Sequence, residues 1–199
     1  MTTKPILFSG PMVRALLDGR KTQTRRVLKD QPTWDRVEAI VKRFPNQTAG
    51  VPFAVGDVLW VRETWSHTGD GVWSVHDAQR AHNGRVIYKA EGVHPGASFF
   101  PSIHMPRRFS RLTLAVTSVK VERLQDISKE DVIAEGITER EGEPMDGVVC
   151  GWHEPFAELW TSINGAGSWD ANPWVVALTF TVHRCHVDAM ATHVLTAAE

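Results

Sequence analysis

The chain has 199 residues, 42% of them hydrophobic, and a formal net charge of -1. This length suits one domain with insertions, and the apolar content can supply its core. The near-neutral charge argues against a protein that coats nucleic acid by bulk electrostatics, because neutralising many phosphates requires many cations. It leaves room for a local basic patch or for a small substrate.

The sequence also lacks the usual signals of export and membrane insertion. No stretch is long and apolar enough to span a bilayer, and the first residues, Met-Thr-Thr-Lys-Pro, carry no apolar run of a signal peptide. The two cysteines, Cys150 and Cys185, are too few for a disulfide framework. We therefore expect a cytoplasmic protein with no membrane partner.

The first part of the chain predicts a helix and a strand separated by a long excursion. Residues 11–18 place apolar side chains at helical spacing, and Gly19 is well placed to end that helix. Residues 28–52 carry mixed charges and three prolines, which is typical of a loop or a partly helical insertion. Residues 58–63 alternate as a strand. Glu63 continues its apolar face and is therefore either a site residue or the exposed end of the strand.

The rest of the chain predicts an insertion followed by two strands and two helices. In chain order, we expect an insertion with a hairpin at 66–105, a strand at 111–121, a helix capped by Ser128 that closes at Gly136, a helix at 154–163, a closing strand at 174–182 and a tail at 184–199. Short strands with helices in irregular order indicate an α+β fold. The predicted organisation is one domain over 1–183, with insertions near 28–52 and 66–105, followed by the tail.

Nine histidines raise the question of a metal site. Cys150 and His153 have C-x-x-H spacing, and His183 and His186 have H-x-x-H spacing. A zinc site needs three or four converging ligands, and neither pair has a matching second pair elsewhere. We expect no metal and no other cofactor.

Chemically useful groups are concentrated directly after the first predicted helix, in Gly19-Arg20-Lys21-Thr22-Gln23-Thr24-Arg25-Arg26. A lysine three residues from a threonine can act as base and nucleophile in amide hydrolysis. Arginines beside them can hold a phosphate or a base edge. The same residue types are also typical of a solvated basic loop. On a regular strand Lys21 and Thr24 would point to opposite faces, so the chain must bend near Lys21 for the two side chains to converge.

The pattern Gly19-x-Lys21-x-x-Thr24-x-Arg26 resembles the G-x-K-x-x-[polar]-x-R signature of ASCH domains, which are small β-barrels related to the PUA fold. Three further segments support the likeness in the expected order: Gly56-Asp57-Val58-Leu59, residues 127–136 and residues 172–180. Residues 61–65 together with 167–174 resemble the longer ASCH proteins that are common in phages and prophages. The resemblance spans roughly residues 4–183 and implies a PUA-like barrel with flanking helices and two insertions.

The resemblance also implies an activity. One bacterial member type is an N4-acetylcytidine amidohydrolase that uses a Lys, a Thr and a Glu, which fall by motif on Lys21, Thr24 and Glu135. We therefore expect removal of an acyl group from an N4-acylated cytosine nucleoside or a related modified base. The expected substrate-binding residues are two arginines for polar atoms, two tryptophans for stacking and a reserve carboxylate: Arg25, Arg26, Trp65, Trp169 and Glu63.

The alternative is a module that binds RNA or another nucleic acid, and some family members are reported to cleave RNA. In that case a basic rim would grip RNA or single-stranded DNA without amide hydrolysis, formed by Lys21, Arg25, Arg26, Arg107, Arg108 and Arg111. The near-neutral net charge favours the small substrate. A degenerate domain retained for binding a partner is a third interpretation.

Overall fold

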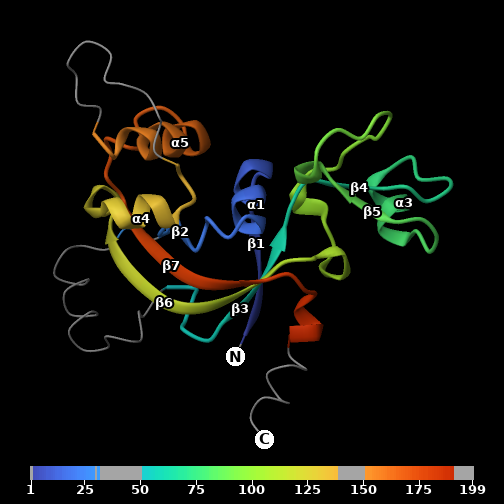
Figure 1. Cartoon of the computed structure of the whole chain (residues 1–199), viewed down its shortest axis with the longest axis horizontal. Coiled ribbons are helices and arrows are strands. Elements are labelled where there is room, and N and C mark those ends of the chain that lie inside the picture. Colours follow the sequence, from blue (N-terminus) through green and yellow to red (C-terminus); the bar gives the residue numbers. More distant parts are fainter. Residues whose placement is uncertain (1, 30, 32–50, 139–150, 191–199) are drawn as a thin grey trace, which may run out of the picture. The chain divides into compact units, whose positions relative to one another are not determined.

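The structure is a computed structural model that describes residues 2–29, 31, 51–138 and 151–190. Strands and helices follow one another in irregular order, which confirms the expected α+β class (Figure 1). The strands are β1 (Thr3–Leu7), β2 (Gln23–Val27), β3 (Val58–Arg62), β4 (Trp65–His67), β5 (Val86–Tyr88), β6 (Thr113–Arg123) and β7 (Trp174–His183). The helices are α1 (Gly10–Leu17), α3 (Val75–Arg80), α4 (Lys129–Ala134) and α5 (Glu154–Asn164). No helix in these residues has the length and apolar character needed to cross a membrane.

Five strands form the main sheet, in the order β1-β3-β6-β7-β2. β1 runs parallel to β3, whereas β3 pairs with the start of β6 in the antiparallel direction. β2 is antiparallel to β7. The order ends at β1 and at β2, so the pairing among the described strands forms an open sheet and not the closed barrel that the resemblance implies.

The chain divides into two compact units. Unit 1 comprises residues 1–19, 56–115 and 181–199, and unit 2 comprises residues 20–55 and 116–180. The strands β6 and β7 therefore contribute residues to both units. The three residues expected to carry the chemistry all belong to unit 2.

Helix α1 forms where apolar spacing predicts it. Val13, Ala15 and Leu16 are buried, as expected for one apolar face of a short helix. The preceding Ser9 occupies the N-cap in an extended conformation. The chain turns at Gly19, whose φ of 74° lies in the left-handed region that glycine adopts without a steric penalty. The helix therefore ends before the basic segment begins.

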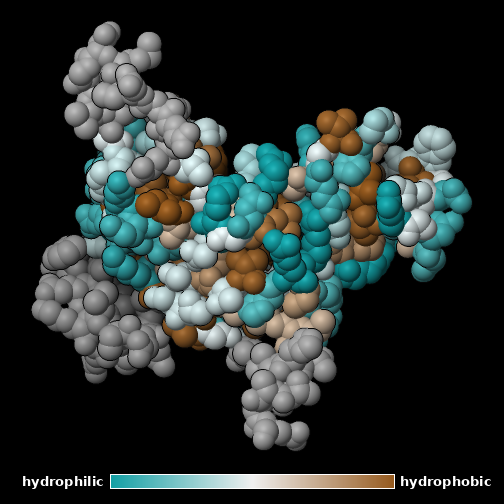
Figure 2. Space-filling view, in the orientation of Figure 1, coloured by the Kyte–Doolittle hydropathy of each residue, from teal (hydrophilic) through white to brown (hydrophobic). Residues whose placement is uncertain are grey.

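The expected insertion in unit 1 contains a pair of strands with its own small core. β4 and β5 are antiparallel, and helix α3 begins with a capping box between Ser74 and Asp77. Buried side chains pack together beneath them: Trp65, Ala78, Met105 and Phe109. In the space-filling view, the part that carries β4, β5 and α3 shows hydrophobic patches among mostly hydrophilic atoms (Figure 2).

The segment after β7, expected to be a tail, begins by joining the core of unit 1. Val187 and Met190 are buried and cluster with Val58 and Trp60. Residues 191–199, and most of the excursion expected at 28–52, lie outside the described residues.

Candidate functional site

The backbone before β2 is already paired with its neighbours. Lys21 first forms an isolated antiparallel bridge with Glu135, just beyond the end of α4. The N–H of Thr22 donates to the carbonyl of Ala134 at 2.8 Å, and the carbonyl of Thr22 accepts from the N–H of Phe180 at 2.9 Å. The regular strand begins at the next residue. Lys21 therefore lies two residues before β2. Its side chain meets Glu135, as that of Arg25 does, whereas Thr24 lies on the other face of the strand.

Lys21 and Glu135 form a buried ion pair. Lys21 Nζ donates to Glu135 Oε2 at 2.5 Å and to the Glu135 carbonyl at 2.9 Å. Lys21 is 0% exposed and Glu135 is 5% exposed. Burial lowers the pKa of Lys21 because the ammonium loses its hydration, and the nearby carboxylate of Glu135 opposes this shift. Since burial is the larger effect, the amine lies closer to neutrality than a surface lysine.

Arg25 holds the same carboxylate and two others. Its Nη1 donates to Glu135 Oε1 at 3.3 Å, and its Nη2 donates to Asp131 Oδ2 at 2.6 Å. Its Nε and Nη2 donate to Glu122 Oε1 at 3.0 and 2.7 Å. Arg25 is buried, and all three of its nitrogens are used within the protein. This geometry differs from the substrate contact expected for Arg25 and makes it an organiser of the site.

Helix α4 presents two of these carboxylates to β2. The helix begins at the Ser128 cap, whose hydroxyl accepts from the N–H of Asp131 at 3.1 Å. Asp131 and Glu135 are four residues apart and therefore face the same side of the helix end. Gln23 Nε2 donates to Asp131 Oδ1 at 3.0 Å. This side of the helix end therefore contacts Gln23 and Arg25, the alternate residues of β2 that point toward it. The acidic helix and the basic strand thus neutralise each other locally.

Thr24 and Arg26 lie on the opposite face of β2 from Gln23 and Arg25, as the two-residue period of a strand requires. Arg26 Nη1 donates to Thr24 Oγ1 at 3.2 Å, whereas Arg25 Nη1 donates to Gln23 Oε1 at 2.5 Å. Thr24 is buried and Arg26 is half-buried. Burial lowers the pKa of Arg26, and the charge of Glu135 opposes this. Arg26 therefore contacts the Thr24 hydroxyl and also lies within electrostatic range of the Lys21–Glu135 pair.

Comparison with known proteins gives one structural likeness. No protein-family model matches the chain, and no curated protein matches its sequence. A crystal structure of an ASCH domain from Lactobacillus crispatus JV V101 is similar, with 14% identity, a match that covers 91% of this chain and 79% of that chain, and a TM-score of 0.38. Both the identity and the TM-score are low, so this likeness says nothing about the chemistry of the site.

Of the two tryptophans expected to stack on a base, Trp169 is the partly exposed one. It belongs to unit 2, as Lys21 does. Its ring lies edge-on to Phe156, with centroids 6.0 Å apart, and is tilted toward His153 at 6.3 Å. Trp169 therefore combines a packed edge with access to solvent.

Trp65 does not have the exposure that stacking on a base needs. It belongs to unit 1, is 0% exposed and lies between Phe100 and Phe109, with ring centroids at 5.3 and 5.1 Å. A ring enclosed in this way offers no free face to a ligand. The expected binding role of Trp65 is corrected to that of a core residue of the insertion.

Glu63, the expected reserve carboxylate, is a buried ion-pair partner in unit 1. It is 1% exposed, and its Oε1 and Oε2 accept from Arg111 Nε and Nη2 at 2.8 and 3.0 Å. Burial raises the pKa of Glu63, and the Arg111 guanidinium opposes this shift. Of the two interpretations of this carboxylate, the structure excludes the exposed end of a strand.

The basic rim expected for a nucleic-acid-binding module does not form as such. Lys21 and Arg25 are buried and paired with carboxylates. Arg107 pairs with Asp188, and Arg108 donates to a backbone carbonyl of the insertion. Most of these cations therefore serve contacts within the chain.

Sequence analysis missed Glu122, which is 4% exposed on β6 and receives two hydrogen bonds from Arg25. A carboxylate near the end of an otherwise alternating strand is the signal that would have found it. Among the described residues there is no group of three or more His, Cys, Asp or Glu that could hold a metal ion. Cys150, which has C-x-x-H spacing to His153, lies outside the described residues.

Proposed function

We propose that this protein is an amidohydrolase that removes the acyl group from an N4-acylated cytosine nucleoside or a related modified base. The observation that carries the proposal is the buried Lys21 amine, held 2.5 Å from Glu135, with a pKa lowered by burial. An exposed lysine is protonated at neutral pH, whereas a desolvated one can accept a proton. The choice of an acylated cytosine follows the likeness of the Lys21-x-x-Thr24 motif to the ASCH amidohydrolases.

In the proposed reaction, Thr24 is the nucleophile and Lys21 the base. Thr24 Oγ1 attacks the acyl carbonyl carbon while the neutral Lys21 amine takes the hydroxyl proton. The C–N bond then breaks, N4 takes the proton from the Lys21 ammonium, and cytidine leaves. Water hydrolyses the acyl ester on Thr24, which releases acetate and restores the hydroxyl. Glu135 orients Lys21 through both of its contacts.

Access to the site requires a side chain to move, because Lys21, Thr24 and Glu135 are at most 5% exposed. Arg26 is half-buried and bonded to the Thr24 hydroxyl. We infer that the substrate displaces this contact, which frees Thr24 and leaves the Arg26 guanidinium beside the acyl oxygen or the pyrimidine O2. A guanidinium in that position stabilises the oxyanion that forms during attack.

The test is incubation of the purified protein with N4-acetylcytidine and quantification of acetate and cytidine. The proposal expects both products from wild type and their loss in Lys21→Ala and Thr24→Ala. Lys29→Ala, which removes an exposed lysine just after β2, serves as the matched control and should retain the wild-type rate. No product from wild type, or unchanged turnover in the two site variants, contradicts the proposal.

Binding of nucleic acid without turnover is the competing outcome. A gel shift with single-stranded RNA that weakens with salt, and weakens further in Arg26→Ala, would favour it when acetate release is absent. Arg26 is the decisive residue because, of the three rim cations expected from the motif, Lys21 and Arg25 are buried.

A further inference from the structure

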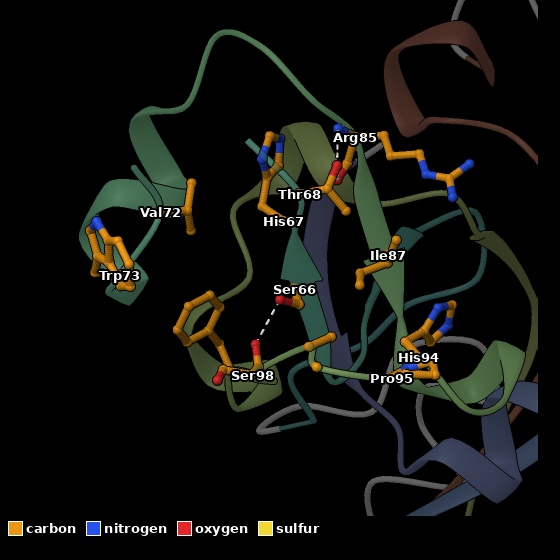
Figure 3. A pocket seen from close by; sticks show the side chains of 13 residues that line it. Ser66, His67, Thr68, Val72, Trp73, Arg85, Ile87, His94, Pro95 and Ser98 are labelled. Atoms are coloured by element: carbon orange, nitrogen blue, oxygen red, sulfur yellow. Dashed lines mark hydrogen bonds between the residues drawn. The ribbon is translucent and has the colours of Figure 1, made fainter. Parts of the chain in front are cut away.

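A cavity of about 480 Å³ lies in the insertion of unit 1 (Figure 3). Its walls come from β4 and the residues that follow it, from β5, from the segment before α3 and from residues 94–100. This volume falls within the range of roughly 300–1,000 Å³ that is usual for small-molecule sites. The cavity takes no part in the proposed reaction of Lys21, which belongs to the other unit.

An exposed aromatic ring stands at the edge of the cavity. Trp73 is 91% exposed although it lines the cavity, and Figure 3 shows it with Val72 across from Ile87 and His94. A tryptophan this exposed contributes little to the core of the insertion. Indole rings in such positions stack on flat heterocycles, which cover the apolar surface that water otherwise contacts.

The charge of the lining is positive. Arg85 is the one arginine or lysine among the lining residues, and no aspartate or glutamate lines the cavity. The backbone of Arg85 is fixed, because its N–H donates to Thr68 Oγ1 at 3.0 Å and its carbonyl accepts from the Thr68 N–H at 3.0 Å. Its guanidinium is exposed and can meet an anion.

His94 adds a polar group that lacks a partner. Its Nε2 is buried and has no hydrogen-bond partner among the described residues, which is a costly state for a ring nitrogen. The surrounding wall is fixed, since Ser66 Oγ donates to the Ser98 carbonyl at 2.6 Å. Because Nε2 has almost no exposed surface, the His94 ring must turn before a polar atom on the edge of a heterocycle can become its partner.

We propose that this cavity binds a planar heteroaromatic ligand that carries an anionic group, with the size and chemistry of a 5′-phosphorylated nucleotide. The heterocycle stacks on Trp73, its polar edge meets His94, and the phosphate pairs with Arg85. The ligand is a free nucleotide or the end of a single strand, because both present the same base and phosphate. This site is independent of the proposed amidohydrolase activity.

The experiment is titration calorimetry on the full chain with adenosine 5′-monophosphate, adenosine, inorganic phosphate and a 5′-phosphorylated tetranucleotide RNA. We expect the monophosphate to bind at least about tenfold more tightly than adenosine, because charge-assisted hydrogen bonds add to stacking. Trp73→Ala should weaken binding by about fivefold or more. Arg85→Ala should weaken the monophosphate by about tenfold and leave adenosine unchanged. The controls, Trp152→Ala and Arg14→Ala, alter exposed or partly exposed side chains away from the lining and should bind as wild type.

Both test variants alter exposed side chains, so circular dichroism should show an unchanged fold. If the tetranucleotide binds with the same losses in both variants and the free nucleotide does not bind, the site stands and its ligand is a strand end. The proposal is overturned if neither nucleotide nor strand binds at millimolar concentration. It is equally overturned if Trp73→Ala and Arg85→Ala bind as wild type does.

Discussion

Lys21 and Glu135 are 114 residues apart in sequence, and the Lys21 ammonium contacts both the carboxylate and the carbonyl of Glu135. The backbones of the two residues also form a bridge, so strand-like pairing brings the two side chains together. Arg25 donates to the second oxygen of the same carboxylate. Glu135 thus has two cationic partners, and the two ends of the pair should respond differently to mutation.

Removing Glu135 should cost more stability than removing Lys21. In Glu135→Ala both Lys21 and Arg25 lose a buried partner, which should lower the free energy of unfolding by about 3–5 kcal/mol. In Lys21→Met the carboxylate keeps Arg25, so we expect a loss of about 1–3 kcal/mol. Urea unfolding at neutral pH measures both. A loss in Lys21→Met that equals or exceeds the loss in Glu135→Ala contradicts this asymmetry.

The lowered pKa of Lys21 predicts a pH dependence of stability. A free lysine titrates near about 10.4, so between the lower folded pKa and that value the unfolded chain binds a proton that the folded chain does not. The free energy of unfolding should therefore rise with pH in this window, by at most about 1.4 kcal/mol per pH unit from this group. Lys21→Met should show a smaller slope in this window, just below about pH 10.

Above that window, Tyr88 changes stability in the opposite direction. Burial raises the pKa of Tyr88 to about 12, so above about pH 10 the folded chain holds a proton that the unfolded chain loses, and stability falls. Denaturant curves below this limit isolate the lysine. Identical slopes in wild type and Lys21→Met would show that Lys21 keeps an ordinary pKa.

Arg25 should not tolerate replacement by lysine. Its fork contacts Glu122, Asp131 and Glu135 at once, and an ammonium cannot reproduce that planar set of donors. We expect Arg25→Lys to lower the free energy of unfolding by about 3 kcal/mol or more, since buried carboxylates lose their partner. Arg20→Lys, at an exposed arginine that donates to the Gly136 carbonyl, is the control and should stay within about 0.5 kcal/mol. Similar losses in the two variants would mean that the fork is dispensable.

Local sequence patterns predicted several of the elements but not the strands β1 and β2. Apolar spacing at 11–18 corresponds to α1, and the closing strand expected at 174–182 corresponds to β7. The Ser128 cap also forms as its position predicts. Pairing between distant strands is not encoded in such patterns, so the open strand order, which differs from the barrel that the resemblance implies, could not be derived from them.

The candidate site shows the same limit. The resemblance named both Lys21 and Glu135, and the two side chains are in contact. Arg25 looked like a substrate contact, and only its position on the inward face of β2 shows that carboxylates surround it. Trp65 and Trp169 are the same residue type. Their exposure differs because Phe100 and Phe109, distant in sequence, enclose the first ring.

The Glu63–Arg111 pair should protect unit 1 most strongly at neutral and higher pH. Burial already raises the pKa of Glu63, and removing Arg111 removes the charge that opposes this shift. Arg111→Met should therefore cost about 3 kcal/mol at pH 8 and less at pH 5, where the folded chain can keep Glu63 protonated. Arg107→Met breaks an exposed pair with Asp188 and should cost about 0–1 kcal/mol at either pH. If the loss of unfolding free energy in Arg111→Met does not shrink on acidification, Glu63 is not a buried carboxylate that depends on Arg111.

Two tryptophans of the insertion should behave in opposite ways. Trp65→Ala removes a fully buried ring and should lower the free energy of unfolding by about 3–5 kcal/mol. Trp73→Ala removes a ring that is 91% exposed and should change it by less than about 0.5 kcal/mol. Thermal and urea unfolding of both variants test the division between core and binding surface. A large loss in Trp73→Ala would place that ring in the core.

The central claim is that the buried Lys21 amine acts as a base toward an acylated cytosine. Its most direct test is the initial rate of acetate release from N4-acetylcytidine by wild type, Lys21→Met and the exposed control Lys29→Met at pH 8. We predict release by wild type and by the control, and a rate at least about 100-fold lower in folded Lys21→Met, because acid–base catalysis is lost. Release at the wild-type rate by folded Lys21→Met, or no release by wild type, would contradict the claim.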